Sequence, residues 1–141
     1  MKNHRLSKIA EDFSIELIFL FGSQKENGYK ILKGENIEIK DPLTDLDIGV
    51  VFKKGFFPQK PYVIFGPLYF ELAEVFHPLT PDLIFLEKTD STFQFEAIEG
   101  ICIFNTDMET LENYIEKVLT FAADWKVFRD RIDQDFLKIK R

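Results

Sequence analysis

Three short apolar runs constrain the fold of this chain more than any other feature of its sequence. They span residues 15–21, 46–52 and 81–86, and turn-forming residues border each of them. Runs of this length, rich in β-branched and aromatic residues, are typical of buried strands. A fourth and shorter run of the same kind covers residues 101–104. The sequence therefore predicts a small sheet.

Helices are predicted between these runs. Apolar residues recur at the spacing of one helix face in residues 2–13 and again in residues 68–76. A shorter helix is expected at 91–99, with Ser91 as its N-terminal cap and Gly100 after its end. Strands that alternate with helices predict an α/β or α+β domain, in which helices flank a small mixed sheet.

Two segments are expected to be mainly loop. Residues 24–44 are polar and contain two glycines and a proline, which predicts a short helix or turn followed by a long loop or a small hairpin. Residues 53–67 hold three prolines and two glycines, so a loop is expected along their whole length.

Residues 107–141 contain neither glycine nor proline, which favours one long helix. Their apolar residues alternate in steps of four and three, forming a heptad-like seam that Arg129 interrupts. Acidic residues dominate the start of the segment and basic residues its end, as suits a helix dipole. We therefore predict a core at 1–106 and a C-terminal helical extension of the same domain at 107–141. The seam either packs on this chain's own sheet or joins a homodimer or a partner's helices.

The composition is that of one globular domain, because 45% of the 141 residues are hydrophobic and 30% are charged. The net charge is −6, so no bulk positive field favours binding to a nucleic-acid backbone. A single cysteine, Cys102, excludes a disulfide framework and is expected to be a buried, unreactive thiol. His4 and His77 lie far apart in the sequence, so no zinc-type cluster is predicted.

The sequence also shows no targeting segment that we can identify. The first residues lack the apolar core of a secretory signal. No apolar stretch reaches the length that spans a bilayer. We therefore expect a cytoplasmic protein with no membrane partner.

Asp45 and Asp47 stand at the start of the second predicted strand. Residues two apart in a strand point to the same face, so both carboxylates project together. Neighbouring carboxylates repel and raise each other's pKa, so such a pair is favoured on a wet surface or where a cation binds. Mg²⁺ prefers carboxylate oxygens together with phosphate oxygens and water. Taken alone, the pair fits either a solvated surface or a metal site.

Two further features belong to the neighbouring strands. Gly22 and Ser23 follow the first strand, and a glycine turn lets the backbone approach a ligand closely. A helix that starts at Ser23 would also offer free N–H groups to a phosphate. Asp82 begins the third strand and could complete a metal site or accept a proton from an attacking hydroxyl. Each feature is also explained by ordinary turn or strand-end structure.

Together the three features resemble the signature of the DNA polymerase β-type nucleotidyltransferase superfamily. In that signature a strand ends in Gly-Ser, a second strand carries Asp-x-Asp and a third carries Asp, as in residues 19–23, 44–51 and 81–86. Within the superfamily the chain is similar to the minimal nucleotidyltransferases (MNT). This group includes the MntA-like antitoxins of HEPN/MNT toxin–antitoxin pairs, in which the toxin is a HEPN ribonuclease.

The resemblance implies a role for each motif residue. Gly22 and Ser23 would hold the triphosphate of ATP. Asp45 and Asp47 would bind Mg²⁺, and Asp82 would help to bind the metal and activate the acceptor hydroxyl. The implied reaction transfers AMP from ATP to a hydroxyl group and releases pyrophosphate, with Mg²⁺ and positioning contributing most of the rate.

The resemblance continues in the helix, glycine and strand at 95–104 and in the tail at 128–131. The chain departs from the family pattern between Ser23 and Asp45, where the 21 intervening residues are more than is usual. The arginine that usually follows Gly-Ser is missing, so a nearby lysine would have to replace it as a phosphate contact. The additional segment would cover the site or contact a partner.

Three functional hypotheses follow. In the first, the chain is an enzyme that transfers AMP to a tyrosine hydroxyl of a HEPN-type toxin and so silences it. In the second, the nucleotide site is inactive and the chain neutralises its partner by occlusion. The long segment, the missing arginine, the 16 phenylalanines and the C-terminal seam favour that second hypothesis. A small-molecule transferase is disfavoured, because 141 residues leave little room for additional substrate-binding structure.

Overall fold

The computed structural model describes the backbone of residues 3–140 and the side chains of residues 3–124, 130 and 131. The elements follow in the order α1 (Asn3–Phe13), β1 (Ile15–Phe21), α2 (Lys25–Leu32), β2 (Leu46–Phe52), α3 (Pro61–Phe76), β3 (Pro81–Phe85), the short turn η1 (Leu86–Lys88), α4 (Ser91–Ile98), β4 (Ile101–Asn105) and α5 (Met108–Lys140). The expected fold class, a small sheet flanked by helices with a long C-terminal helix, is confirmed.

The four strands form one mixed sheet in the order β3–β2–β1–β4. β1 runs antiparallel to both of its neighbours, β2 and β4, whereas β2 and β3 are parallel. A parallel pair needs a long crossover connection, and α3 supplies it. This order places the end of β1 next to the beginning of β2, and the beginning of β2 next to that of β3.

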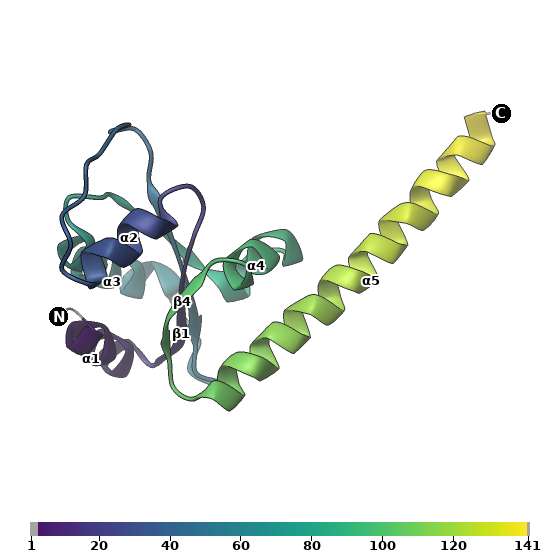
Figure 1. Cartoon of the computed structure of the whole chain (residues 1–141). Helices are drawn as coiled ribbons and strands as arrows, with labels where there is room; N and C mark the ends of the chain where they lie inside the picture. The colour runs from purple at the N-terminus through teal and green to yellow at the C-terminus, as the bar shows by residue number, and fades with distance from the viewer. Residues whose placement is uncertain (1–2, 141) are drawn as a thin grey trace.

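Helices cover both faces of the sheet (Figure 1). α1, α2 and α3 lie on one face, where Leu6, Ile31 and Leu72 belong to the larger buried core. α4 and the first part of α5 lie on the other face, where Ala97 belongs to a smaller buried cluster and Tyr114 packs against that cluster. β1 is covered on both faces, which explains why its sequence is a continuous apolar run and does not alternate with polar residues.

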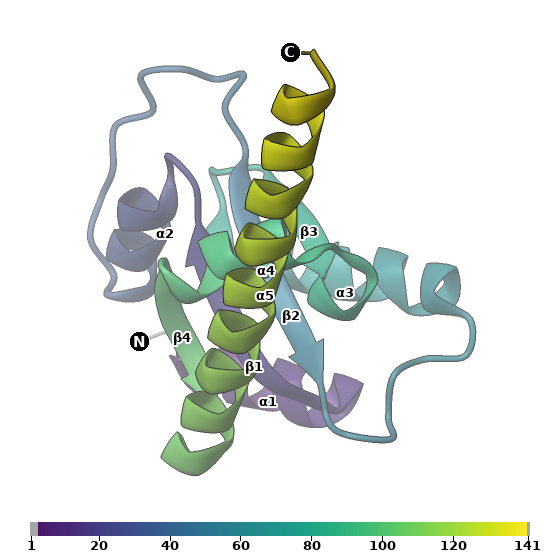
Figure 2. The same ribbon diagram turned by 90° about the vertical axis from the view of Figure 1, so that its right-hand side faces the viewer.

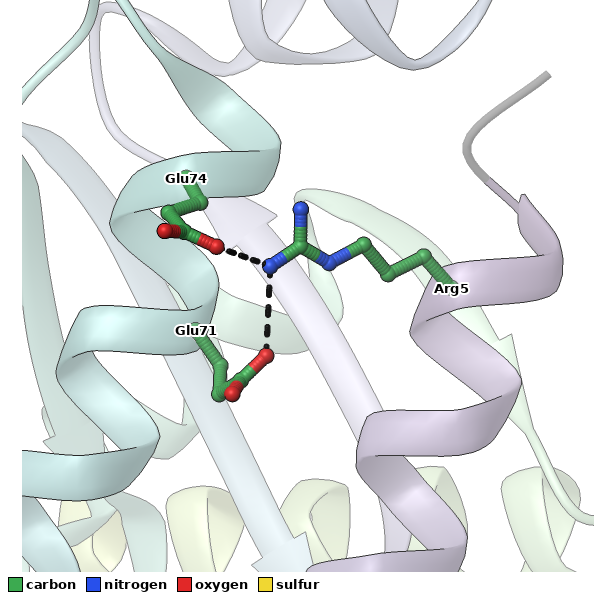
Figure 3. A network of polar contacts seen from close by, with 3 residues as sticks. All are labelled: Arg5, Glu71 and Glu74. Carbon is green, nitrogen blue, oxygen red and sulfur yellow. Dashed lines mark hydrogen bonds and ion pairs between the residues drawn. The ribbon is translucent and has the colours of Figure 1, made fainter.

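An ion-pair network joins α1 to α3 at the surface (Figure 3). The Arg5 guanidinium lies 3.2 Å from a carboxylate oxygen of Glu71 and also contacts Glu74. Their side chains are 42%, 41% and 46% exposed, so each pair contributes little to stability. Apolar packing beneath the network therefore supplies most of the attachment between the two helices.

The first turns of α5 hold it against the sheet (Figure 2). Val118 is fully buried, and the ring of Tyr114 lies 5.8 Å from that of Phe19 between centroids. Beyond this point the helix runs away from the rest of the molecule, with Leu119 and Phe121 exposed. The seam thus packs on the chain's own sheet in its first part, whereas its later residues lie outside the described side chains. No helix in the described part of the chain, α5 included, is both long and apolar enough to cross a membrane.

The structure corrects two local predictions. The loop expected at 53–67 is too long, because α3 already begins at Pro61. Proline is favoured at the start of a helix, where its missing N–H has no intrahelical partner to lose. Asp90 rather than Ser91 caps α4, and its carboxylate accepts hydrogen bonds from two amides of the first turn. For residues 24–44 the structure selects one of the alternatives left open, because the short helix α2 is followed by a loop at 33–45 and not by a hairpin.

Cys102 is half-buried in β4 rather than fully buried. Its thiol donates a hydrogen bond to the carbonyl of Phe104 at 3.2 Å. Burial raises the pKa of the Cys102 thiol, which keeps it protonated. Because the thiolate is the reactive form, the expectation of an unreactive cysteine remains in place.

Candidate functional site

The strand register brings two of the predicted carboxylates together. Asp47 of β2 pairs directly with Asp82 of β3, and on its other side it pairs with Phe21 at the end of β1. Asp45 lies just before β2, two residues from Asp47. Segments that are far apart in the sequence therefore meet at one end of the sheet.

Both paired carboxylates project from the sheet face that α4 and α5 cover. In β2, Leu46 and Ile48 belong to the core under α1, α2 and α3, so Asp47 between them points to the opposite face. In β3, Leu83 belongs to the same core, so its neighbour Asp82 points the same way as Asp47.

Asp47 is the half-buried member of the group, and its pKa is raised to about 6. Loss of hydration is the largest cause of this rise. The charge of Asp82, a hydrogen bond with Asp82 and the charge of Asp45 raise the pKa further. A hydrogen bond between two carboxyl groups requires a proton, which removes the repulsion between two negative charges. A divalent cation bound between the carboxylates would replace that proton and relieve the same repulsion.

A fourth carboxylate, Glu96 on α4, also acts on this group. Its charge contributes to the raised pKa of Asp47. Sequence reasoning missed Glu96, because no motif or spacing connects it to the strands. The packing of α4 brings it near, since its neighbour Ala97 is buried against the same sheet face.

The turn after β1 passes directly across Asp47. Gly22 has a φ angle of +77°, and a Cβ atom built on it would lie 2.2 Å from Oδ2 of Asp47. Glycine alone combines the left-handed backbone with so close an approach. Position 22 therefore requires a glycine, which is the residue that the Gly-Ser motif places there.

Ser23 is exposed and makes no side-chain hydrogen bond within the described part of the chain. α2 begins at Lys25 with Gln24 at its N-cap, so the helix start considered at Ser23 lies two residues later. The Lys25 amide donates to the carbonyl of Gly22 at 3.4 Å and closes the turn. The Ser23 hydroxyl is therefore available to a ligand at the mouth of this turn.

A complete metal-binding set is not formed by the side chains as they stand. Among the described residues, no group of three or more histidine, cysteine or acidic side chains is arranged to hold a metal ion. Asp47 and Asp82 interact directly, and Asp45 acts on Asp47 through its charge. The donor chemistry fits a hard cation such as Mg²⁺, because every candidate ligand is a carboxylate oxygen. Asp45 is exposed and lies two residues from Asp47 in the sequence.

Comparison with known families finds one match. A family model described as "Polymerase beta, Nucleotidyltransferase" matches residues 4–109, which include the Gly22 turn and all three predicted aspartates. No curated protein sequence matches the chain significantly.

Solved structures with a similar fold come from toxin–antitoxin complexes. A chain of a toxin–antitoxin structure with AMP-PNP is 18% identical, with a TM-score of 0.67 over 97% of this chain and 99% of that chain. A chain of the tri-AMPylated Shewanella oneidensis HEPN toxin in complex with MNT antitoxin is 18% identical, with a TM-score of 0.63 over 96% of each chain. A chain of the toxin–antitoxin MntA–HepT is 17% identical, with a TM-score of 0.63 over 96% of this chain and 97% of that chain. At these identities the likeness shows a shared fold over nearly the whole chain.

Proposed function

Because the chain belongs to the polymerase β nucleotidyltransferase family, we propose that it transfers AMP from ATP to a hydroxyl group of a partner protein. One observation carries this proposal: at one end of the sheet, Asp47 lies beside both the Gly22 turn and Asp82. A backbone turn beside paired carboxylates suits a polyphosphate bound through a cation, because phosphate and carboxylate oxygens can share one Mg²⁺.

In the proposed reaction, the acceptor oxygen forms a bond to the α-phosphorus of ATP, and the bond from that phosphorus to the bridging oxygen breaks. Pyrophosphate leaves with the bridging oxygen, and the hydroxyl proton passes to the exposed carboxylate of Asp82. Gly22 and Ser23 hold the triphosphate. Mg²⁺, held by Asp45, Asp47 and Asp82, would supply the positive charge that offsets the phosphate charge.

We further propose a HEPN-type toxin as the partner, with a tyrosine hydroxyl as the acceptor. The solved structures of similar fold support this choice, because one of them contains a tri-AMPylated HEPN toxin together with an MNT antitoxin. The chain would then act as an antitoxin. The exposed Leu119 on α5 offers apolar surface for such a contact.

The proposal is tested with the cognate toxin, Mg²⁺ and ATP labelled at the α-phosphate. Label should appear on the toxin, disappear with EDTA and fall more than about a hundredfold with Asp47→Asn. Asp12→Asn on α1 is a matched control, because it removes an equally charged but exposed side chain. Undiminished labelling by the Asp47→Asn protein would refute the proposed role of the carboxylates.

Neutralisation by occlusion is the second candidate function, and the incomplete carboxylate set among the described residues favours it. An occluding antitoxin needs no ATP, so the combined Asp45→Asn and Asp47→Asn variant should silence the toxin's RNA cleavage as well as wild type does. If transfer of AMP is responsible, the same variant should leave the toxin active. RNA cleavage measured with and without ATP distinguishes the two functions.

A further inference from the structure

A cavity lies at the opposite end of β2 from the carboxylates. Its volume is about 830 Å³, and β2, the loop after it, η1, α4 and the first half of α5 line it. Asp47 and Phe52 mark the two ends of the strand, and five residues of strand span about 16 Å. The cavity is therefore separate from the proposed catalytic site, and its size suits a small organic ligand.

Basic side chains gather around this cavity in a chain that is acidic overall. Lys53, Lys54 and Lys117 line it, although the net charge of the chain is −6. All three lysines are exposed, and none of them takes part in an ion pair among the described residues. Their ammonium groups are thus available to an anion that enters from solvent.

Two acidic residues, Glu16 and Glu87, line the same cavity. The Glu87 carboxylate accepts a hydrogen bond of 2.7 Å from the Phe52 amide, and the charge of Lys117 lowers the pKa of Glu87, which burial raises. Burial and the charge of Asp107 raise the pKa of Glu16, and the charge of Lys53 acts against that rise. Three lysines against two acids leave an excess of positive charge at the cavity.

Aromatic and polar side chains complete the wall. Phe57 and Phe121 supply rings and Val118 an apolar floor, while Thr110 and Asn113 supply hydrogen-bonding groups. Aromatic rings beside lysines are the combination that binds nucleotides in single strands, because the base stacks and the phosphate is attracted to the cations. A hydroxyl and an amide can pair with the edge of such a base.

The hydroxyl group of Tyr114, which also lines the cavity, lacks a hydrogen-bond partner. It is the one buried side-chain polar atom without a partner among the described residues, and its side chain lines the cavity. Buried hydroxyl groups normally have a partner. The partner that this hydroxyl lacks would come from a ligand bound in the cavity.

We propose that this cavity is a second nucleotide-binding site, which takes a base on its aromatic wall and a phosphate on its lysines. The nucleotide is either free or part of a single-stranded nucleic acid, since both present the same base and phosphate. The proposal does not rest on the transfer of AMP, because it uses none of the catalytic carboxylates.

Binding is measured on the full chain by NMR of the backbone amides, in EDTA, with AMP and with a short single-stranded adenine RNA as probes. Either probe should shift the amide signals of Lys54, Gly55, Asn113 and Lys117. Tighter binding of the RNA than of AMP would assign nucleic acid as the source of the ligand. Equal affinities would assign a free nucleotide.

The lysines provide the test by substitution. Lys54→Gln combined with Lys117→Gln should weaken AMP binding about tenfold, because charge-assisted contacts to the phosphate are lost. Lys30→Gln combined with Lys40→Gln makes the same charge change away from the cavity and should leave binding intact, as should Asp47→Asn. The proposal is overturned if neither probe shifts the cavity signals, if both lysine pairs act alike, or if Asp47→Asn abolishes the shifts.

Discussion

Asp47 is the residue on which the electrostatics of the candidate site converge. Its pKa of about 6 lies above the ordinary aspartate value of 3.8, mainly because it is desolvated and next because Asp82 lies beside it. A group whose pKa is raised by folding binds protons more tightly in the native state than in the unfolded state. Its contribution to stability is therefore present at acid pH and is lost as the pH rises through this range.

The first prediction concerns this pH dependence. Between about pH 4 and pH 6, ionisation of Asp47 should lower the free energy of unfolding by about 1–2 kcal/mol, after allowance for screening by solvent. Asp47→Asn should lack this component and should be more stable than wild type at neutral pH. Urea denaturation of both proteins across that range, in EDTA, measures it. Identical pH dependence in the two proteins would contradict the raised pKa.

The second prediction concerns the turn at Gly22. Gly22→Ala should be destabilised by the left-handed backbone and also by the collision with Asp47 Oδ2, and it should lose the magnesium-dependent part of nucleotide binding. Gly34→Ala is a matched control, because Gly34 has a φ of +81° but open space around it. Gly22→Ala should lower the free energy of unfolding by about 1–3 kcal/mol more than the control does. Equal losses in thermal denaturation would show that the close approach does not matter.

Among the elements, the strands were the most predictable from sequence. β1 and β2 coincide with the apolar runs at 15–21 and 46–52, because turn-forming or polar residues interrupt the chain at their ends. The start of α3 was predicted wrongly, because proline is common both in loops and in the first turn of a helix, and Pro61 begins α3. Local patterns thus locate a buried strand better than a helix that opens with proline.

The candidate site was predictable as a set of residues but not as a geometry. The motif singles out Asp45, Asp47 and Asp82, whereas the contact between the last two depends on parallel pairing of β2 with β3. Such pairing is non-local, so neither spacing nor composition reveals it. Glu96 was missed for the same reason, because only the packing of α4 brings its charge near Asp47.

The third prediction concerns the docking of α5. Tyr114→Phe removes a buried hydroxyl without a partner and keeps the ring that packs beside Phe19. The substitution should therefore raise the free energy of unfolding by about 1 kcal/mol, measured by urea denaturation. A comparable loss of stability would instead show that the hydroxyl is hydrogen-bonded in solution.

For the molecule as a whole, α5 has two parts with different surroundings. Its beginning belongs to the core, because Val118 is buried and Tyr114 packs on the sheet. Its later part leaves the body of the protein (Figure 1). The division into a core at 1–106 and an extension at 107–141 therefore stays a prediction that stability measurements can test.

The fourth prediction follows from this division. Deleting residues 124–141 removes none of the buried contacts of α5 that are described, so the free energy of unfolding should change by less than about 1 kcal/mol. Neutralisation of the toxin should persist, because the proposed contact residue Leu119 remains in the truncated protein. Circular dichroism with urea measures the first effect, and sedimentation of both proteins tests the homodimer. Loss of folding on truncation would show that the later part of the helix also stabilises the core.

Isothermal titration of ATP into the whole protein, first with Mg²⁺ and then with EDTA, tests whether Asp47 and its neighbours form a nucleotide site. We predict a magnesium-dependent component of ATP binding that disappears in EDTA and in Asp47→Asn and that persists in the Asp12→Asn control. Any binding of ATP at the lysine-lined cavity should be the same in all of these experiments. ATP binding that remains undiminished both in EDTA and in Asp47→Asn would contradict the assignment of the site to these carboxylates.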